Sequence, residues 1–376
     1  MFKDVLKNYI YPIAVFSGGM IGVGFLSLPY VAVKTGIWLM LLYFLVLTAL
    51  VVAINLIFCQ ISLKTPDFKR FPGFVGYYLG KWAKLFTSAS VIFGTVGVLL
   101  VYILIGGQFL TSVFQPIFSG SVLTYIFIYF LIASVIIYFD IKVVAKVEFW
   151  VIALLFLSLF FIFVEGFSQI KLSNIFGNFQ FLISNFQNVF LPYGPLLFAL
   201  WGIGLIPEVE EMLRTNKKRL KTIVTASTIT VSVFYFLFVL LILGITGTQT
   251  DPTALQGLKS FLPSALVFIS LLIGALATFT AFITQGIIFK KTLMFDLKIK
   301  HWQAFIMTCF PPMILFLLGL KSFIPLLSFV GGVLLGIDGI LVLLMYKKIG
   351  GKNIIIYPLS LVFLLGVIYE IIYFIK

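Results

Sequence analysis

Two short stretches of the sequence combine glycine and proline in a way that could expose backbone groups for binding. The first runs from Ser17 to Pro29 and holds four glycines; in the second, from Phe198 to Glu208, a Gly-Ile-Gly matches the Gly-Val-Gly of the first. Where a helix is interrupted, free N–H groups can bind an anion and free carbonyls can bind an ammonium group or a cation. A zwitterionic amino acid fits both kinds of group.

The glycines also have a simpler interpretation. Each costs a helix interior about 1 kcal/mol relative to alanine, but small residues let membrane helices pack closely. The spacing favours a site, because the motifs begin at Gly22 and Gly202, where an inverted repeat of five plus five helices would place corresponding elements. We therefore predict that a side chain at Gly24 or Gly204 intrudes on backbone that a bound molecule must approach, and that Gly24→Leu loses activity while the protein stays folded.

The composition places these motifs in a membrane. Of the 376 residues, 62% are hydrophobic and only 10% are charged, which would give a soluble protein an apolar surface. The apolar segments are continuous runs and not the alternating strands of an outer-membrane barrel, so we expect an all-α, polytopic membrane protein. Because roughly 20 apolar residues cross a bilayer, the chain offers about eleven transmembrane helices.

Charged and turn-forming residues bound the expected spans. Five runs carry no charge, the third long enough to span twice, and five further segments complete the eleven: Asn8 to Val33, Thr35 to Leu63, Leu85 to Phe139, Thr222 to Thr250 and Ser260 to Phe289, then Phe149 to Val164, Pro192 to Met212, Trp302 to Leu320, Ser322 to Tyr346 and Asn353 to Phe374. The third run is expected to turn at Gln115, Pro116, Ser119 and Gly120. We expect one domain over 1–376, with repeats at about 10–165 and 190–347 and an extra helix at about 353–374.

Basic residues predict the orientation, because short loops rich in Lys and Arg face the cytoplasm. If the chain starts inside, all but five of the 26 Lys and Arg lie on the inner side; the exceptions are Lys34, Lys171, Lys259, Lys321 and Lys376. We expect a multi-pass protein of the cell membrane with a cytoplasmic N-terminus and an external C-terminus. The net charge of +14 then faces anionic lipid and not nucleic acid. Between Lys64 and Lys84 an aromatic-rich segment predicts an amphipathic helix on the inner surface.

The remaining reactive residues form no catalytic or metal-binding pattern. Cys59 and Cys309 lie inside expected spans, and the only histidine, His301, sits at a helix end without a nearby acid pair. We therefore expect no enzyme, no metal site, no cofactor and no obligate protein partner beside the lipid bilayer. A channel or scramblase is the alternative class, since broken helices also line pores. Saturable, gradient-driven uptake would distinguish a carrier from it.

Four segments are together specific enough to carry a family resemblance. They are Gly18 to Pro29 (Gly-Gly-Met-Ile-Gly-Val-Gly-Phe-Leu-Ser-Leu-Pro), Phe198 to Met212, Leu276 to Leu297, and Pro311 to Tyr346 with its Gly331-Gly332. Through them the chain resembles the amino acid/auxin permease family, within the LeuT-fold superfamily, over nearly its whole length. The second segment is most similar to prokaryotic members related to aromatic amino acid permeases, which does not define the substrate.

This resemblance implies a secondary active amino acid transporter, a symporter in which helices one, two, six and seven rock against a scaffold that includes helices three, four, eight and nine. The substrate carboxylate would meet the backbone of Ile21, Gly22, Val23 and Gly24, and the amino group would meet carbonyls near Met20 and at Phe198, Ala199 and Leu200. Gly202 and Gly204 would belong to the second interruption. Selection among side chains would fall to Tyr102, Trp201 and Phe279, for which simple aromatic packing is the alternative.

The coupling ion is open between sodium and proton. The resemblance would assign sodium ligands to the carbonyls of Gly18, Ile21 and Ala277 and the hydroxyl of Thr280, but the fifth position falls on Ala281, which has no hydroxyl. Some proton-coupled relatives place a lysine on helix five, and the span from Phe149 to Val164 contains none. Asp338, the acid expected to lie deepest in the membrane, could carry a proton, because burial disfavours the ionised form. This favours proton coupling. Among the other acids, Glu210 and Glu211 are expected to pair with Arg214.

Overall fold

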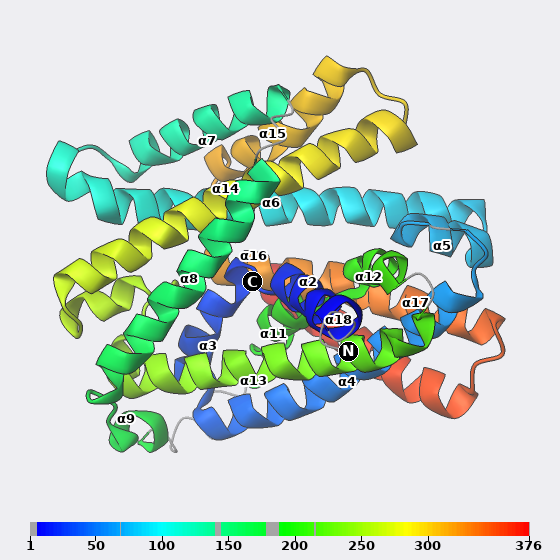
Figure 1. The fold of residues 1–376 in the computed structure, drawn as a ribbon, viewed down its shortest axis with the longest axis horizontal. Coiled ribbons are helices and arrows are strands. Elements are labelled where there is room, and N and C mark those ends of the chain that lie inside the picture. The colour runs from blue at the N-terminus through cyan, green and yellow to red at the C-terminus, as the bar shows by residue number, and fades with distance from the viewer. Residues whose placement is uncertain (1–5, 68, 140–143, 178–187, 214–215, 376) are drawn as a thin grey trace. The chain divides into compact units, whose positions relative to one another are not determined.

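The computed structural model describes residues 6–67, 69–139, 144–177, 188–213 and 216–375, and this part of the chain is helical without strands (Figure 1). Contacts between the helices divide the chain into two compact units. Unit 1 comprises Met1–Val91, Phe179–Val239 and Leu327–Lys376, and unit 2 comprises Ile92–Asn178 and Leu240–Leu326. Each unit combines segments from both halves of the chain. Unit 1 contains helices one, two and six and most of helix seven, which are the helices expected to rock. Unit 2 contains most of the expected scaffold.

Unit 1 is built from the following helices: α2 (Tyr11–Met20), α3 (Leu28–Thr35), α4 (Ile37–Lys64), α5 (Phe71–Leu79), α11 (Tyr193–Leu200), α12 (Ile206–Leu213), most of α13 (Leu220–Thr246), α17 (Gly336–Lys348) and α18 (Asn353–Ile375). Short segments with other helical geometry adjoin them: π-helical Leu6–Ile10 and Phe329–Leu335, and 3-10 turns at Val23–Ser27, Ile203–Leu205 and Lys217–Arg219. α17 packs along α18, and the π-helical segment before α17 packs on both α11 and α18.

Unit 2 contains most of α6 (Lys81–Phe118), α7 (Val122–Tyr138), α8 (Val144–Phe167), α9 (Leu172–Phe176), α14 (Ser264–Asp296), α15 (His301–Leu317) and the first part of α16 (Phe323–Ser328). Two 3-10 turns, Gly247–Gln249 and Gln256–Ser260, precede α14. α14 is the central element, because it packs on α7, α8 and α15. In Figure 1, α7, α14 and α15 lie side by side.

The hydrophobic segments predicted as spans are mainly helical where the structure describes them, with interruptions such as those at 21–22, 119–121 and 201–202. Six helices are long and apolar enough to cross a membrane, and the bent pair Asn8–Met20 and Val23–Thr35 makes up to seven among the described residues. Three shorter apolar helices, Val122–Tyr138, Ala153–Phe167 and His301–Leu317, fall in further predicted spans. The multi-pass helical membrane fold is thereby confirmed, and the count of eleven stays a prediction.

The turn inside the long third run lies later than expected. α6 continues through Gln115 and Pro116 to Phe118, and the chain turns at Ser119 (φ 61°) and Gly120 (φ 109°). Pro116 lies in the last turn of the helix, where it removes a single backbone hydrogen bond and leaves the turns before it intact. The helix predicted between Lys64 and Lys84 is present as α5.

A buried lysine caps the C-terminal end of α7 in unit 2. Lys290 of α14 is fully buried, and its Nζ donates to the carbonyls of Ile137 at 2.6 Å and Tyr138 at 3.1 Å. His301 lies on the same ammonium group, with Nε2 at 3.3 Å. The last carbonyls of a helix have no intrahelical partner and carry partial negative charge, so the ammonium group satisfies and stabilises this helix end.

Replacing Lys290 with methionine is expected to lower the stability of the protein by roughly 1–3 kcal/mol, because buried carbonyls lose their donor. Thermal unfolding of the purified protein in detergent measures this. Lys291→Met, at the next and partly exposed position, is the matched control and should melt near the wild-type temperature. Equal melting of the two variants would contradict the capping role.

Candidate functional site

The first predicted interruption is present in unit 1. α2 ends at Met20, Ile21 (φ −79°, ψ 87°) and Gly22 (φ −110°, ψ −167°) leave the helical conformation, and a 3-10 turn begins at Val23. The two helical pieces are bent by 52° at this point. The first N–H groups of a new helical segment have no acceptor within it. The break therefore supplies backbone donors next to Gly24.

The second interruption is also present in unit 1. α11 ends at Leu200, Trp201 is extended (φ −72°, ψ 121°), and Gly202 (φ −132°, ψ 6°) leads into a 3-10 turn that continues as α12. The ring of Trp201 meets Phe363 of α18 edge-on, with ring centroids 6.4 Å apart. Carbonyls at the end of α11 lack the partners that a continuous helix would give them.

Three of the glycines let the broken helices pack against each other. A Cβ on Gly19 would lie 2.7 Å from Leu205, one on Gly24 would lie 2.6 Å from the ring of Phe198, and one on Gly202 would lie 2.8 Å from the ring of Phe16. These distances leave no room for a side chain, so close packing explains all three glycines. Gly18 and Gly204 differ, because a Cβ on either would meet no atom within 4 Å.

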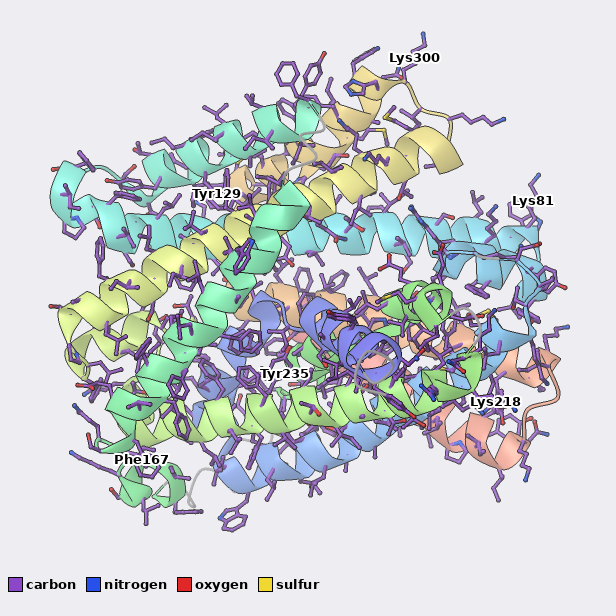
Figure 2. All side chains as sticks on the ribbon, viewed as in Figure 1. Lys81, Tyr129, Phe167, Lys218, Tyr235 and Lys300 are labelled. Atoms are coloured by element: carbon purple, nitrogen blue, oxygen red, sulfur yellow. The ribbon has the colours of Figure 1, made fainter. Side chains whose placement is uncertain are left out.

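Tyr235 of α13 joins the ends of both broken helices. Its ring is fully buried and stacks on Phe25 at 5.4 Å, and its hydroxyl lies 3.0 Å from the carbonyl oxygen of Met20 and 3.4 Å from that of Ala199. Figure 2 labels Tyr235 within unit 1. Both carbonyls lie where the sequence predicts contact with an amino group. The sequence did not single out Tyr235; its only signal was a hydroxyl-bearing ring within an apolar span.

The carbonyl oxygens of Met20 and Ala199 differ in the hydrogen bonds that they already accept. The Met20 oxygen accepts from the N–H of Gly22 at 2.9 Å as well as from Tyr235, and a carbonyl oxygen has two lone pairs. Ala199 receives only the longer contact from Tyr235 among the hydrogen bonds outside the regular helices. A bound ammonium group would therefore compete with Tyr235 at Met20 and could bind beside it at Ala199.

The aromatic candidates of unit 2 lie around Tyr129 of α7. The ring of Phe279 stands edge-on to that of Tyr129 at 5.3 Å, and Tyr102 interacts electrostatically with the same tyrosine. A Cβ on Gly106 of α6 would overlap the Tyr129 ring. The structure thus groups Tyr102 and Phe279 within one cluster of unit 2.

The candidate ion ligands lie in both units, two in each. Gly18 and Ile21 belong to unit 1, and Ala277 and Thr280 belong to α14 of unit 2. The Thr280 hydroxyl is buried and donates to the carbonyls of its own helix at Leu276 and Ala277, each at 3.1 Å. Its oxygen keeps lone pairs for a cation.

Two buried acids lie near the C-terminal end of unit 1. Asp338, in the first turn of α17, is 8% exposed, and its Oδ1 has no hydrogen-bond partner. Glu370 of α18 is 0% exposed, and its Oε1 accepts from the N–H of Gly194 at 3.1 Å. Asp338 was expected to be the acid that lies deepest in the membrane, and this stays a prediction; within the protein, Glu370 is the more fully buried of the two.

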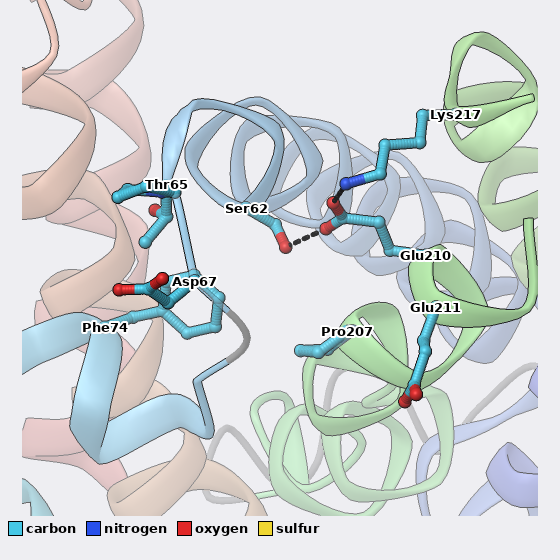
Figure 3. Close-up of a pocket in the computed structure, with 9 residues that line it drawn as sticks. Ser62, Thr65, Asp67, Phe74, Pro207, Glu210, Glu211 and Lys217 are labelled. Carbon is cyan, nitrogen blue, oxygen red and sulfur yellow. Dashed lines mark hydrogen bonds and ion pairs between the residues drawn. The ribbon is translucent and has the colours of Figure 1, made fainter. Parts of the chain in front are cut away.

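A cavity of about 240 Å³ lies within unit 1 between the ends of α4 and α12 (Figure 3). Its walls include Ser62, Thr65, Pro66, Asp67, Phe74, Pro207, Glu210, Glu211 and Lys217. Glu210 accepts hydrogen bonds from the Ser62 hydroxyl and from Nζ of Lys217, the latter at 2.7 Å. Arg214, the expected partner of Glu210, lies outside the described residues. Glu210 thus links α12 to α4 and to the 3-10 turn Lys217–Arg219.

Comparison with known proteins covers almost the whole chain. The sequence profile of the tryptophan/tyrosine permease family matches residues 7–358. Among solved structures, the crystal structure of MhsT in complex with L-phenylalanine is similar over 97% of this chain and 97% of that chain, with a TM-score of 0.60 and 14% sequence identity. A search of curated proteins found no match. The structural likeness shows the LeuT-type fold, and at this identity it shows the fold alone.

Proposed function

Since the chain belongs to the tryptophan/tyrosine permease family, and so is an amino acid transporter and not an enzyme, we propose that it carries aromatic amino acids by alternating access. We further propose that a proton gradient drives it and that its family lies within the amino acid/auxin permeases. The observation that carries this proposal is the pair of broken helices in unit 1, whose ends meet at Tyr235. Such breaks are the usual place of substrate binding in transporters of this architecture.

Substrate binding is proposed to use the backbone at both breaks. The N–H groups that follow Gly22 receive the carboxylate, because the start of a helical segment carries partial positive charge. The ammonium group binds carbonyls at the end of α11, with that of Ala199 the most available. Tyr235 holds the two helix ends at a fixed spacing while this happens. Backbone contacts of this kind bind any amino acid, so they leave selection to side chains.

An aromatic substrate is supported by two findings. The family is named after tryptophan and tyrosine, and the similar structure of MhsT is a complex with L-phenylalanine. In this chain, Trp201, Tyr102 and Phe279 offer rings for the substrate side chain, and aromatic pairs add about 0.5–1.5 kcal/mol beyond the buried area. We propose Trp201 as the first of these, because it lies directly in the second break.

Proton coupling is supported by the incomplete sodium ligand set and by the buried acids. Ala281 supplies no hydroxyl where a fifth sodium ligand would be needed, whereas Asp338 offers a buried carboxyl with an unused oxygen. We propose that Asp338 carries the proton. Sodium bound at Gly18, Ile21, Ala277 and Thr280 is the alternative.

Purified protein in liposomes tests the proposal. We expect saturable uptake of labelled tryptophan, tyrosine or phenylalanine above that of leucine, lysine and glutamate, driven by an imposed proton gradient and absent for Asp338→Asn. Uptake driven by sodium at clamped pH, with Asp338→Asn fully active, would contradict the proton and direct attention to Thr280. Flux that neither saturates nor accumulates substrate would support the channel or scramblase alternative.

The proposed orientation in the cell membrane has a test of its own. With eleven spans and basic inner loops, the N-terminus is cytoplasmic and Lys376 is external. Single cysteines near each end, in a background in which Cys59 and Cys309 are replaced by alanine, should react with impermeant maleimide from the inside and the outside respectively. Labelling of a cysteine near Lys376 only from the inside would show that the helix count is wrong.

A further inference from the structure

Glu370 lies at a point where three elements of unit 1 meet. Its Oε1 accepts from the N–H of Gly194 in the first turn of α11. A Cβ on Gly332 of the π-helical segment would overlap the Glu370 side chain, and one on Gly194 would lie 2.6 Å from both Glu370 Oε1 and Ser328 Cα. The carboxyl group is thus enclosed by α11, α18 and the chain that leads into α17.

Three polar atoms in this region have no hydrogen-bond partner although they are buried. They are Oε2 of Glu370, the hydroxyl of Ser328 and the hydroxyl of Tyr193. Glu370 and Ser328 are 0% exposed, and Tyr193 is 4% exposed. The Tyr193 hydroxyl lies 3.5 Å from the position of a Cβ on Gly336, one helical turn beyond Gly332. Buried polar atoms are nearly always paired, so three unpaired atoms in one region, a carboxyl oxygen among them, are unusual.

The charges around Glu370 do not neutralise it. The ionisable side chains that interact with it are all tyrosines: Tyr43 of α4, Tyr193 of α11, and Tyr369 and Tyr373 of α18. Among the described residues, neither Asp338 of α17 nor any Lys, Arg or His pairs with Glu370. A carboxylate so enclosed binds a proton readily when it lacks a cationic partner.

We propose that Glu370 is a second proton-binding site, and that its protonation controls how firmly α18 holds the outer half of the second broken helix. When ionised, the carboxylate binds the positive N-terminal end of α11 through charge as well as through the Gly194 N–H. A proton from solvent on Oε2 removes the charge and leaves a neutral acceptor at Oε1. α11 is then held less firmly, and its other end is the Trp201 break. This inference rests on the proposed transport function and adds a regulatory site to it.

Exchange of labelled for unlabelled phenylalanine across liposomes, without any gradient, tests the proposal. The sign follows from the charge: exchange by the wild type should slow as pH rises, because the ionised carboxylate holds α11. Glu370→Gln cannot ionise, so its exchange should be independent of pH and equal to the rate that the wild type reaches at low pH. Glu165→Gln, an exposed acid on α8, is the matched control and should keep the wild-type profile.

Asp338→Asn separates the two acids, since it should abolish proton-driven accumulation and still show exchange that slows with rising pH. A wild-type profile that does not depend on pH, or the same dependence in Glu370→Gln, would overturn the inference. If wild-type protein shows no exchange at all, the proposed transport function fails, and infrared spectroscopy then tests Glu370 separately. A titrating carboxyl band of the wild type should shift in Glu370→Asp; an unshifted spectrum would refute proton binding at Glu370. If Glu370→Gln does not fold, the infrared comparison of the wild type with Glu370→Asp tests the proposal in its place.

Discussion

Phenylalanine in place of Tyr235 is expected to lower substrate affinity and transport strongly while the protein stays folded. The ring keeps its stacking on Phe25, but the carbonyls of Met20 and Ala199 lose their common donor. Loss of a donor to buried acceptors costs about 1–3 kcal/mol, which corresponds to roughly 5- to 150-fold in an equilibrium. These hydrogen bonds set the spacing between the two broken helices, so their loss should affect substrate affinity more than the free energy of unfolding.

Binding of labelled phenylalanine and thermal unfolding, measured on the same preparations, distinguish these effects. Tyr357→Phe is the control, because that tyrosine is 59% exposed on α18 and its hydroxyl should be dispensable. A Tyr235→Phe variant with wild-type affinity would show that the hydroxyl does not position the site. A variant that melts much earlier but binds normally when folded would assign Tyr235 to packing.

Leucine at Gly24 is expected to destabilise the protein, and leucine at Gly204 is not. The side chain at Gly24 would enter the ring of Phe198, whereas a Cβ at Gly204 meets no atom within 4 Å. Overpacking of this kind costs about 1–3 kcal/mol, and more where backbone must move. The sequence predicted retained folding for Gly24→Leu. For Gly24 the structure gives a different expectation, because this glycine lies against another helix.

Melting temperature and uptake together separate the two positions. Gly24→Leu should melt earlier and lose uptake. Gly204→Leu should melt like the wild type, and its uptake then reports whether the substrate approaches this part of the second break. Wild-type stability of Gly24→Leu would contradict the contact with Phe198.

The broken helices could be predicted because the signal is local. Glycines beside proline weaken a helix wherever they stand, so Gly22 and Gly202 marked the breaks before any contact was known. The spans were equally accessible, since hydropathy over about 20 residues needs no tertiary information. Both kinds of evidence come from neighbouring residues in the chain.

Contacts between distant residues could not be predicted in this way. Met20 and Tyr235 are 215 positions apart, and nothing in the apolar sequence of α13 shows which carbonyl its tyrosine reaches. Glu370 was overlooked because α18 was treated as an addition to the repeats, although its carboxylate binds the first turn of α11. The role of Gly24 also depended on a partner, Phe198, that only the fold identifies.

The π-helical segment Phe329–Leu335 has a consequence for how sequence changes would act in unit 1. A π-helical turn holds more residues than an α-helical one and in this way absorbs an inserted residue. Deleting one residue here would restore an ordinary α-helix and leave the helix beyond it in the same rotational position, whereas a deletion inside α17 would rotate the residues that follow by roughly 100°, because 3.6 residues make a turn. Gly336 and Gly339 would therefore still face Val367 and Phe363 of α18 after the first deletion. Between Ser328 and α17 the chain thus accommodates the loss of one residue more easily than α17 itself does.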